Sequence, residues 1–197
     1  MNRHRAITAV AIGLAAVGLG WALMTGLSRI LSSSAAPEPI DAPAEPAAPS
    51  TPAVPRIKAT LFFASADGMA LVPVEQESPL AQGTVAQARA LVEAQLTAVA
   101  PDPLATTIPQ GTKLLGVYLS ERNEAFVDLD NTVRTKHPGG SMNELFTVFT
   151  IVNAVATNLP DVQQVQLLID GHEVDTLAGH VDLRRPLRKN ESLHAPK

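Results

Sequence analysis

The chain has 197 residues and a formal net charge of -4 at pH 7, and only 17% of its residues are charged. This length leaves room for one globular domain once the non-globular parts are set aside. The low, negative charge excludes a broad basic surface for nucleic acid. The sequence contains no cysteine, which excludes a disulfide framework, a thiolate metal site, a cysteine nucleophile and a lipid anchor built on cysteine.

Residues 6–27, AITAVAIGLAAVGLGWALMTGL, form an uncharged apolar run. As a helix this run would be about 33 Å long at about 1.5 Å per residue, which matches a hydrocarbon core of about 30 Å. Arg3 and Arg5 precede the run, and acidic residues follow it from Glu38 onward. By the positive-inside rule the N-terminus stays in the cytoplasm and the rest crosses the membrane. We therefore expect residues 1–31 to be a cytoplasmic tip and a single-pass transmembrane signal anchor.

A cleavable signal peptide is the alternative reading of the same segment. Ser33, Ser34 and Ala35 offer the small residues that a cleavage site needs. However, the apolar run is longer than a usual signal core of about 7–15 residues, and Pro37 lies next to the expected cut. We favour the retained anchor. Either reading places the domain outside the cytoplasm.

Residues 32–55 contain seven prolines and seven alanines and almost nothing to bury. Such a composition favours extended polyproline II backbone. At about 3.1 Å per residue the segment could reach on the order of 70 Å. We expect it to be a linker that spaces the domain from the membrane.

The first half of the domain reads as a hairpin followed by a helix. Residues 57–63 and 69–74 are apolar strands around Asp67 and Gly68, a strong turn signal. Thr84 and Gln87 have capping-box spacing and predict the start of a helix. The apolar face of this helix is expected to comprise Val85, Ala88, Leu91, Val92, Gln95, Leu96 and Val99. Pro101 and Pro103 then end it.

The second half repeats the pattern. Residues 113–119 and 125–129 read as a strand pair joined by the polar residues 120–124. A second capping box, Ser141 and Glu144, predicts another helix, whose apolar face is expected to comprise Leu145, Val148, Phe149, Val152, Val155, Ala156 and Leu159. Residues 165–169 read as a largely buried strand that ends at a turn, and residues 174–177 as a short returning strand.

The element order is therefore β-β-α-β-β-α-β, with a short strand after it. Two amphipathic helices and mostly local strand pairing predict an α+β domain of two layers, with a mostly antiparallel sheet and both helices on one face. We expect the domain to occupy residues 56–187, followed by a flexible tail at residues 188–197.

Four blocks of this region resemble the GerMN domain, which was first described in bacterial sporulation and germination proteins. They are LFFASADGMALVPVEQE (residues 61–77), IPQGTKLLGVYLSERNEAFVDLDNTV (residues 108–133), GGSMNELFTVFTIVNAVATNLPDVQQVQLLIDG (residues 139–171) and LAGHVDLRRPL (residues 177–187). The resemblance implies a small module of the cell envelope, similar in shape to the ring-building domains of secretion-type assemblies. It implies no chemistry.

The chain departs from the family pattern in two respects. The family's first helix commonly ends in a glycine-proline loop, whereas this one runs Ala98-Val99-Ala100-Pro101. Many relatives are lipoproteins or carry tandem domains, whereas this chain has one such domain behind an expected transmembrane anchor.

Two groups of polar residues are candidate chemical sites. Asp128 and Asp130 would face the same side at the end of a strand, where paired carboxylates can do acid/base work or bind a cation. Turn formation and capping explain them more simply. The group His172, His180 and Asp182, with Asp170 and Asp175, could supply zinc ligands, but the spacing fits no helix face.

Three further features have structural explanations. Ser141 has no nucleophile motif around it and serves as an expected helix N-cap. Gly139 and Gly140 lack the lysine of a phosphate-binding loop and are expected to supply positive φ angles. Asn153 lies on an otherwise apolar helix face; we expect it to bond a loop carbonyl, the alternative being a partner surface.

We therefore expect no catalytic, cofactor-binding or metal-binding residue, no cofactor and no nucleic-acid partner. The sequence predicts a non-catalytic, membrane-tethered binding or assembly module outside the cytoplasm, with envelope proteins or peptidoglycan as partners. The resemblance implies a link to sporulation, germination or cell-wall-associated complexes. Two alternatives stay open: a peptidoglycan-binding or hydrolytic envelope protein, and a structural domain that self-associates into homo-oligomers.

Overall fold

The computed structural model of the protein describes residues 55–195. The expected anchor, residues 1–31, and all but the last residue of the expected linker, residues 32–55, lie outside the described residues. The elements in chain order are β1 (Arg56–Ala64), β2 (Leu71–Pro79), α2 (Thr84–Thr97), β3 (Leu114–Leu119), β4 (Glu124–Leu129), α3 (Thr132–Thr135), α4 (Ser141–Asn158), β5 (Gln164–Ile169), β6 (His172–Glu173) and the 3-10 turn η1 (Glu191–Leu193).

The strands form two sheets, not the single sheet that the sequence predicts. β1 and β2 make an antiparallel hairpin, and the second sheet has the order β3-β4-β5-β6. In the second sheet β4 and β5 run parallel, whereas β3 and β6 pair with their neighbours antiparallel. The α+β class, the element order and the mostly antiparallel pairing are confirmed. The returning strand is β6, at residues 172–173, and not residues 174–177.

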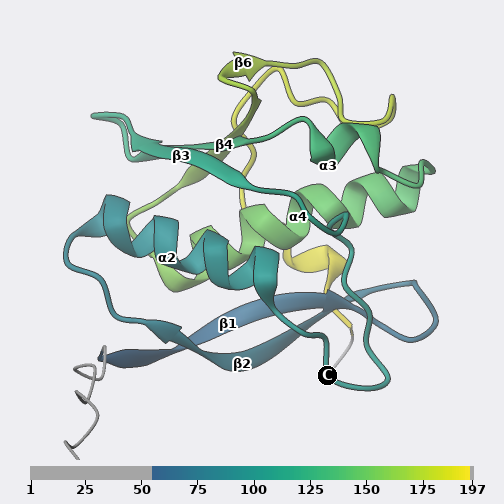
Figure 1. The fold of residues 1–197 in the computed structure, drawn as a ribbon, viewed down its shortest axis with the longest axis horizontal. Coiled ribbons are helices and arrows are strands. Elements are labelled where there is room, and N and C mark those ends of the chain that lie inside the picture. Colours follow the sequence, from purple (N-terminus) through teal and green to yellow (C-terminus); the bar gives the residue numbers. More distant parts are fainter. Residues whose placement is uncertain (1–54, 196–197) are drawn as a thin grey trace, which may run out of the picture. The chain divides into compact units, whose positions relative to one another are not determined.

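The helices lie between the two sheets (Figure 1). Both α2 and α4 contact strands of both sheets, so the expectation of two layers with helices on one face is wrong. The parallel pairing of β4 with β5 requires a crossover connection, and α4 supplies it. The β1–β2 hairpin then covers the opposite side of the helices.

This middle position explains the composition of α4, which is apolar almost all round. Val148, Phe149, Val152 and Val155 of the predicted face are buried. Further buried apolar side chains point in other directions; they are Phe146, Ile151 and Ala154. A helix that is apolar on all sides is buried on all sides, and here a sheet covers each face.

The predicted apolar face of α2 is too long at both ends. Its buried residues are Gln87, Ala88, Leu91, Val92 and Gln95, whereas the Val85 and Val99 side chains are exposed. The predicted capping box is also wrong in detail, because the N-cap is Gly83.

The Gln87 side chain fastens the loop before α2 instead of capping the helix. Its Oε1 accepts a hydrogen bond from the Ala81 N–H at 2.9 Å, and its Nε2 donates to the Pro79 carbonyl at 3.2 Å.

Two side-chain amides occupy the edge of β1 that faces away from β2. Asn158 of α4 accepts a bond from the Thr60 N–H at 2.8 Å and donates to the Thr60 carbonyl at 2.8 Å. Gln95 of α2 does the same for Phe62, at 2.9 and 3.0 Å. Each amide therefore satisfies both backbone groups of its residue, as a neighbouring strand would.

The same edge of β1 is also hydrogen-bonded two residues further along the strand, at Ala64. Ala64 exchanges two backbone hydrogen bonds with Ala105, at 2.8 and 3.0 Å. An open strand edge invites pairing with other chains, and these three contacts close β1 to such pairing. The sequence placed Gln95 on an apolar face, and the bond to Phe62 explains how a buried amide is accommodated there.

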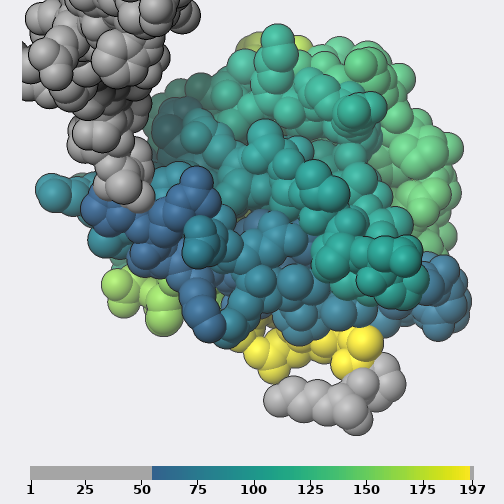
Figure 2. Space-filling view, turned by 60° about the horizontal axis from the view of Figure 1, so that its bottom comes forward, coloured from purple at the N-terminus to yellow at the C-terminus, as the bar shows by residue number. Residues whose placement is uncertain are grey.

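Residues 188–195 pack on the domain, so the prediction of a flexible tail from residue 188 is wrong for these residues. Leu187 exchanges two backbone hydrogen bonds with Val165 of β5, both at 2.8 Å. The chain then crosses to the hairpin, where the Ala195 N–H donates to the Leu71 carbonyl at 3.0 Å. In Figure 2 these yellow residues lie against the blue hairpin.

Asn153 holds this segment from inside α4, which confirms the prediction of an internal bond. The Asn190 N–H donates to Asn153 Oδ1 at 2.9 Å, and Asn153 Nδ2 donates to the Asn190 carbonyl at 3.2 Å. This pair fixes the orientation of the amide. Asn153 Nδ2 also lies 3.1 Å from His194 Nε2, so that nitrogen must be an acceptor and the imidazole is neutral.

His194 also stacks on Phe62 of β1, with ring centroids 5.1 Å apart. Burial lowers the pKa of His194, and Lys189 adds to this effect while Glu191 opposes it. Because the pKa is lower in the folded state, the stabilisation is present above the ordinary value of 6.5 and is lost as the pH falls.

Replacement of His194 by alanine is expected to lower the free energy of unfolding by about 1–2 kcal/mol at pH 8, through loss of the Asn153 bond and the stacking. It should also flatten the pH dependence of stability below 6.5. The measurement is urea unfolding of wild type and variant at several pH values. The matched control is His172→Ala, an exposed position in β6. An equal loss in both variants would contradict the assignment.

Candidate functional site

The carboxylates at the end of β4 close turns. Asp128 accepts a bond from the Gly171 N–H at 2.8 Å, and Asp130 accepts from the Lys113 N–H at 2.8 Å and from the Thr132 hydroxyl at 2.7 Å. Burial raises the pKa of Asp130, but the Lys113 N–H and the Thr132 hydroxyl outweigh it and the net pKa is lowered. Both acids therefore join the ends of neighbouring segments, as the turn reading predicted.

The candidate zinc residues are only partly brought together: Asp175, His180 and Asp182 line one pocket, whereas Asp170 and His172 are not among its lining residues. Asp170 lies at the turn between β5 and β6, where it accepts a bond from the Asn131 N–H. Asp182 makes a two-point ion pair with Arg184, at 2.9 and 2.8 Å. His180 turns toward Glu144. Across residues 55–195, no group of three or more histidine, aspartate or glutamate side chains could hold a metal ion.

Ser141 and the two glycines before it begin α4 without a side-chain cap. The N-cap is Gly140, with φ of 87°, so the predicted N-cap role of Ser141 is wrong. Gly139 also has a positive φ, of 79°, which confirms the expectation for this glycine pair. The cap lacks a side-chain acceptor because Gly140 has no side chain.

Glu144 is fully buried and binds the loop after β6. Its Oε1 accepts hydrogen bonds from the N–H groups of Leu177 and Ala178, at 2.8 and 2.9 Å. Its Oε2 accepts from the His180 N–H at 2.7 Å and lies 3.0 Å from His180 Nδ1. Each oxygen of this carboxylate is therefore engaged by two hydrogen-bond partners. No lone pair is left free to accept a proton from a substrate.

The charge on Glu144 is stabilised by these contacts. Burial raises the pKa of the carboxyl group, but the N–H groups of Ala178, His180 and Val181 and the His180 ring outweigh it, and the net pKa is lowered. This role has no direct sign in the sequence, because Glu144 also fits a capping box. The one available sign of an internal role was an acidic residue one turn into an apolar helix, with no basic residue close to it in the sequence.

An exposed apolar surface lies on β3, the edge strand of the four-stranded sheet. Leu115 and Tyr118 are 48% and 58% exposed. Tyr118 pairs across the sheet with Phe126, which is half-buried. We call the group Leu115, Gly116, Tyr118 and Phe126 the β3 surface. Within the described part of the chain no other strand pairs with the outer edge of β3.

The tyrosine is held flat on this surface. A Cβ atom added to Gly116 would lie 2.7 Å from Tyr118 Oη and 2.9 Å from two ring carbons, so the ring covers the glycine. A bulge between Leu114 and Gly116 shifts the register of β3 against β4. The extra residue leaves Leu115 exposed while Val117 remains in the core.

Gly116→Ala is expected to displace the Tyr118 ring and leave the core intact, because the clash is with an exposed side chain. The change should be visible as altered tyrosine fluorescence or ring NMR shifts. The melting temperature should fall by only a few degrees, since about 1 kcal/mol corresponds to about 2–8 °C in domains of this size range. A loss of folding would contradict the assignment of the ring to the surface.

Solved structures with the same fold define the class of this domain. A candidate lipoprotein from Clostridium perfringens matches with a TM-score of 0.50 and 23% identity over 70% of this chain and 90% of its own. The first GerMN domain of the sporulation protein GerM from Bacillus subtilis matches with a TM-score of 0.51 and 17% identity, covering 67% of this chain and 97% of that domain. The fold is therefore that of a GerMN-type domain.

The tandem GerMN domains of the same Bacillus subtilis protein match with a TM-score of 0.51 and 16% identity over 66% of this chain and 44% of theirs. The sequence profile of the Germane family, described as sporulation and spore germination, matches residues 60–175. The chain belongs to the Germane family. No curated protein sequence matches it. Among residues 55–195, no helix is both long enough and apolar enough to span a membrane.

Proposed function

We propose that this protein is a non-catalytic module of the bacterial cell envelope, and that it meets a protein partner through the β3 surface. The observation that carries the proposal is the exposure of Leu115 and Tyr118 on the same edge strand. Aromatic residues in such positions contribute strongly to protein–protein contacts. The family description and the fold of the neighbouring structures support an envelope-associated role.

The internal bonds of the polar residues favour binding over catalysis. A wall hydrolase needs a nucleophile beside its base, or paired acids open to substrate. Instead Asp128, Asp130 and Glu144 accept bonds from backbone N–H groups. The hydrolytic alternative therefore has weaker support in the described region than the binding module.

The tethering part of the proposal rests on residues 6–27, an uncharged run behind Arg3 and Arg5. The Clostridium perfringens neighbour is described as a candidate lipoprotein. This chain has no cysteine, so a membrane anchor here would be the apolar run itself, residues 6–27. The proline-rich residues 32–55 would then space the domain from the membrane.

Site-specific photo-crosslinking in cells tests the surface. A photoreactive amino acid at Leu115 of the full-length protein is expected to give a discrete crosslinked band, because a partner seated on β3 would contact this side chain. The control is the same amino acid at Val99, which is 83% exposed but lies after α2. Addition of Tyr118→Ala should weaken the Leu115 crosslink. Equal bands from both positions, or a Leu115 band unaffected by Tyr118→Ala, would overturn the proposal.

Complementation of a deletion strain separates the module from an enzyme. Tyr118→Ala is expected to impair function at normal protein level, whereas Asp182→Asn and His172→Ala should not. If Asp182→Asn or His172→Ala folds normally but loses function completely, the result would favour the hydrolytic alternative. A crosslinked band with the mass of two copies of the chain would identify self-association as the contact.

A further inference from the structure

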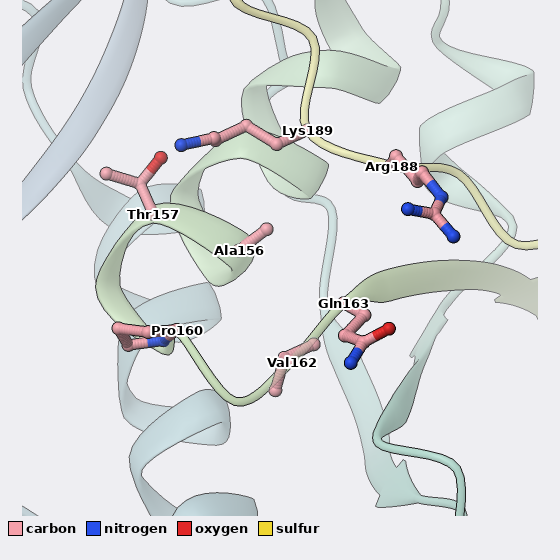
Figure 3. A pocket seen from close by; sticks show the side chains of 7 residues that line it. All are labelled: Ala156, Thr157, Pro160, Val162, Gln163, Arg188 and Lys189. Atoms are coloured by element: carbon pink, nitrogen blue, oxygen red, sulfur yellow. The ribbon is translucent and has the colours of Figure 1, made fainter.

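A cavity of about 450 Å³ lies between the end of α4, the loop to β5 and the segment after Leu187. Figure 3 shows its lining, which comprises Ala156, Thr157, Pro160, Val162, Gln163, Arg188 and Lys189. No carboxylate is among these residues. The cavity therefore combines a small apolar floor with two cationic side chains and two neutral polar ones.

The backbone is anchored by hydrogen bonds immediately before and immediately after the two cationic residues, Arg188 and Lys189. Leu187, just before them, is bonded through its backbone to Val165 of β5. Asn190, just after them, is bonded through its backbone to the buried Asn153. Only Arg188 and Lys189 lie between these two attachments, so their Cα atoms have little freedom. Pre-positioned groups bind a ligand at a lower entropic cost.

The two cations differ in their partners. Lys189 Nζ is paired with Glu191 at 2.7 Å, which offsets its charge. Among residues 55–195, no carboxylate lies within ion-pair distance of Arg188, whereas the exposed Arg56, Arg122 and Arg184 each have one. The cavity thus carries about one uncompensated positive charge, which suits a single negative charge better than a dianion.

The neutral groups extend the same site. In Figure 3 Arg188 and Gln163 lie on the same side of the cavity, near the start of β5, and the Gln163 amide points away from the Arg188 guanidinium. The ammonium end of Lys189 extends toward Thr157 on the other side. The Thr157 hydroxyl is buried and has no hydrogen-bond partner. Buried polar groups usually have partners, so this hydroxyl is an unused bonding position at the cavity wall.

We propose that this cavity binds the free C-terminal carboxylate of a peptide that ends in a small apolar residue. Arg188 takes the carboxylate in the two-point geometry that guanidinium groups favour. Gln163 bonds the adjacent peptide amide. The last side chain rests on Ala156, Pro160 and Val162, where only a small group fits beside the cations. The inference does not depend on the β3 surface, which involves other strands.

Calorimetric titration of the full-length protein tests the proposal. The probe is N-acetyl-alanyl-alanine with a free carboxylate, compared with the same peptide as its C-terminal amide and with inorganic phosphate. The acid is expected to bind, the amide to bind about tenfold or more weakly, and phosphate more weakly than the acid, because a charge-assisted two-point contact is lost or mismatched. Equal binding of acid and amide, tighter binding of phosphate, or no binding of the acid would overturn it.

Variants on the same segment locate the binding. Arg188→Gln is expected to weaken the acid about tenfold or more and leave the weak binding of the amide unchanged. The matched control is Arg185→Gln, which removes an exposed arginine that does not line the cavity and should leave both affinities unchanged. Both side chains are exposed, so both variants should keep the wild-type melting temperature. An equal effect of the two substitutions would show general charge attraction and overturn the site.

Discussion

Replacing Glu144 with glutamine is expected to lower the free energy of unfolding by about 3–5 kcal/mol at pH 7, as for the loss of a buried charged partner. The side chain keeps its shape, but one acceptor oxygen becomes an NH₂ group. That group must face either the N–H pair of Leu177 and Ala178 or the N–H of His180. Donors then oppose donors at a fully buried position.

The measurement is chemical unfolding of Glu144→Gln beside Glu93→Gln. Glu93 lies on the exposed side of α2 and pairs only with Arg89 at 3.7 Å, so its replacement should cost less than about 1 kcal/mol. Similar losses in the two variants would contradict the role of Glu144.

The same residue predicts a loss of stability in acid. Because the folded-state pKa of Glu144 is lowered, its contribution is complete above the ordinary value of 4.5 and is lost as the pH falls toward the folded value. Wild type should therefore lose stability below 4.5 more steeply than Glu144→Gln, which cannot be protonated there. Parallel curves for the two proteins would show that other carboxylates account for the acid sensitivity.

Replacing Gln95 with leucine should have the next largest effect, about 2–5 kcal/mol. Glutamine and leucine side chains differ little in volume, but in the variant the Phe62 N–H and carbonyl both lose their hydrogen-bond partner. Each buried backbone group left unpaired costs about 1–3 kcal/mol. A gain in stability, expected if Gln95 simply lay on an apolar face, would contradict this assignment.

Hydrogen exchange gives an independent readout at the affected strand. The Phe62 amide should exchange faster in Gln95→Leu, while the Thr60 amide, bonded to Asn158, should stay protected. The control is Gln76→Leu on β2, where the amide makes only an exposed bond to the Val99 carbonyl and its loss should be nearly neutral.

Local pattern predicted the elements well because each pattern has a local cause. The Asp67-Gly68 turn fixed the hairpin, and Gly68 has the expected positive φ, of 67°. The helix starts at Thr84 and Ser141 were predicted at the residues where the structure begins α2 and α4. The caps were wrong, because the N-caps are the glycines one residue earlier, Gly83 and Gly140, while Gln87 and Glu144 bond other loop backbone.

The arrangement of sheets could not be read from the sequence. A hairpin with one buried side has the same pattern whether it extends a sheet or forms a separate one. The apolar composition of α4 on all sides was the evidence for a covering layer on each face. The tail was also misjudged, since Asn190 is held by two hydrogen bonds with Asn153, and His194 by its contact with Asn153 and its stacking on Phe62, and not by an apolar run.

Among the candidate sites, those with a local cause were predicted from the sequence, and those formed by the tertiary structure were not. The turn roles of Asp128 and Asp130 followed from their place at the end of a strand. The β3 surface was missed, because Leu115 and Tyr118 fit a buried strand pattern, and the bulge that leaves Leu115 exposed has no sign in the sequence. The cavity at Arg188 was missed because it joins segments about thirty residues apart, and spacing carries no signal over such a distance.

The way the chain enters the domain determines how the domain bears a mechanical load. Tension applied through the residues before Arg56 would run along β1, parallel to the strand. The hydrogen bonds to β2 lie across that direction along the full length of the strand. The amides of Asn158 and Gln95 add bonds on the other edge. Under a load directed along β1 these bonds would shear together instead of opening one by one, so all of them would resist the load at once.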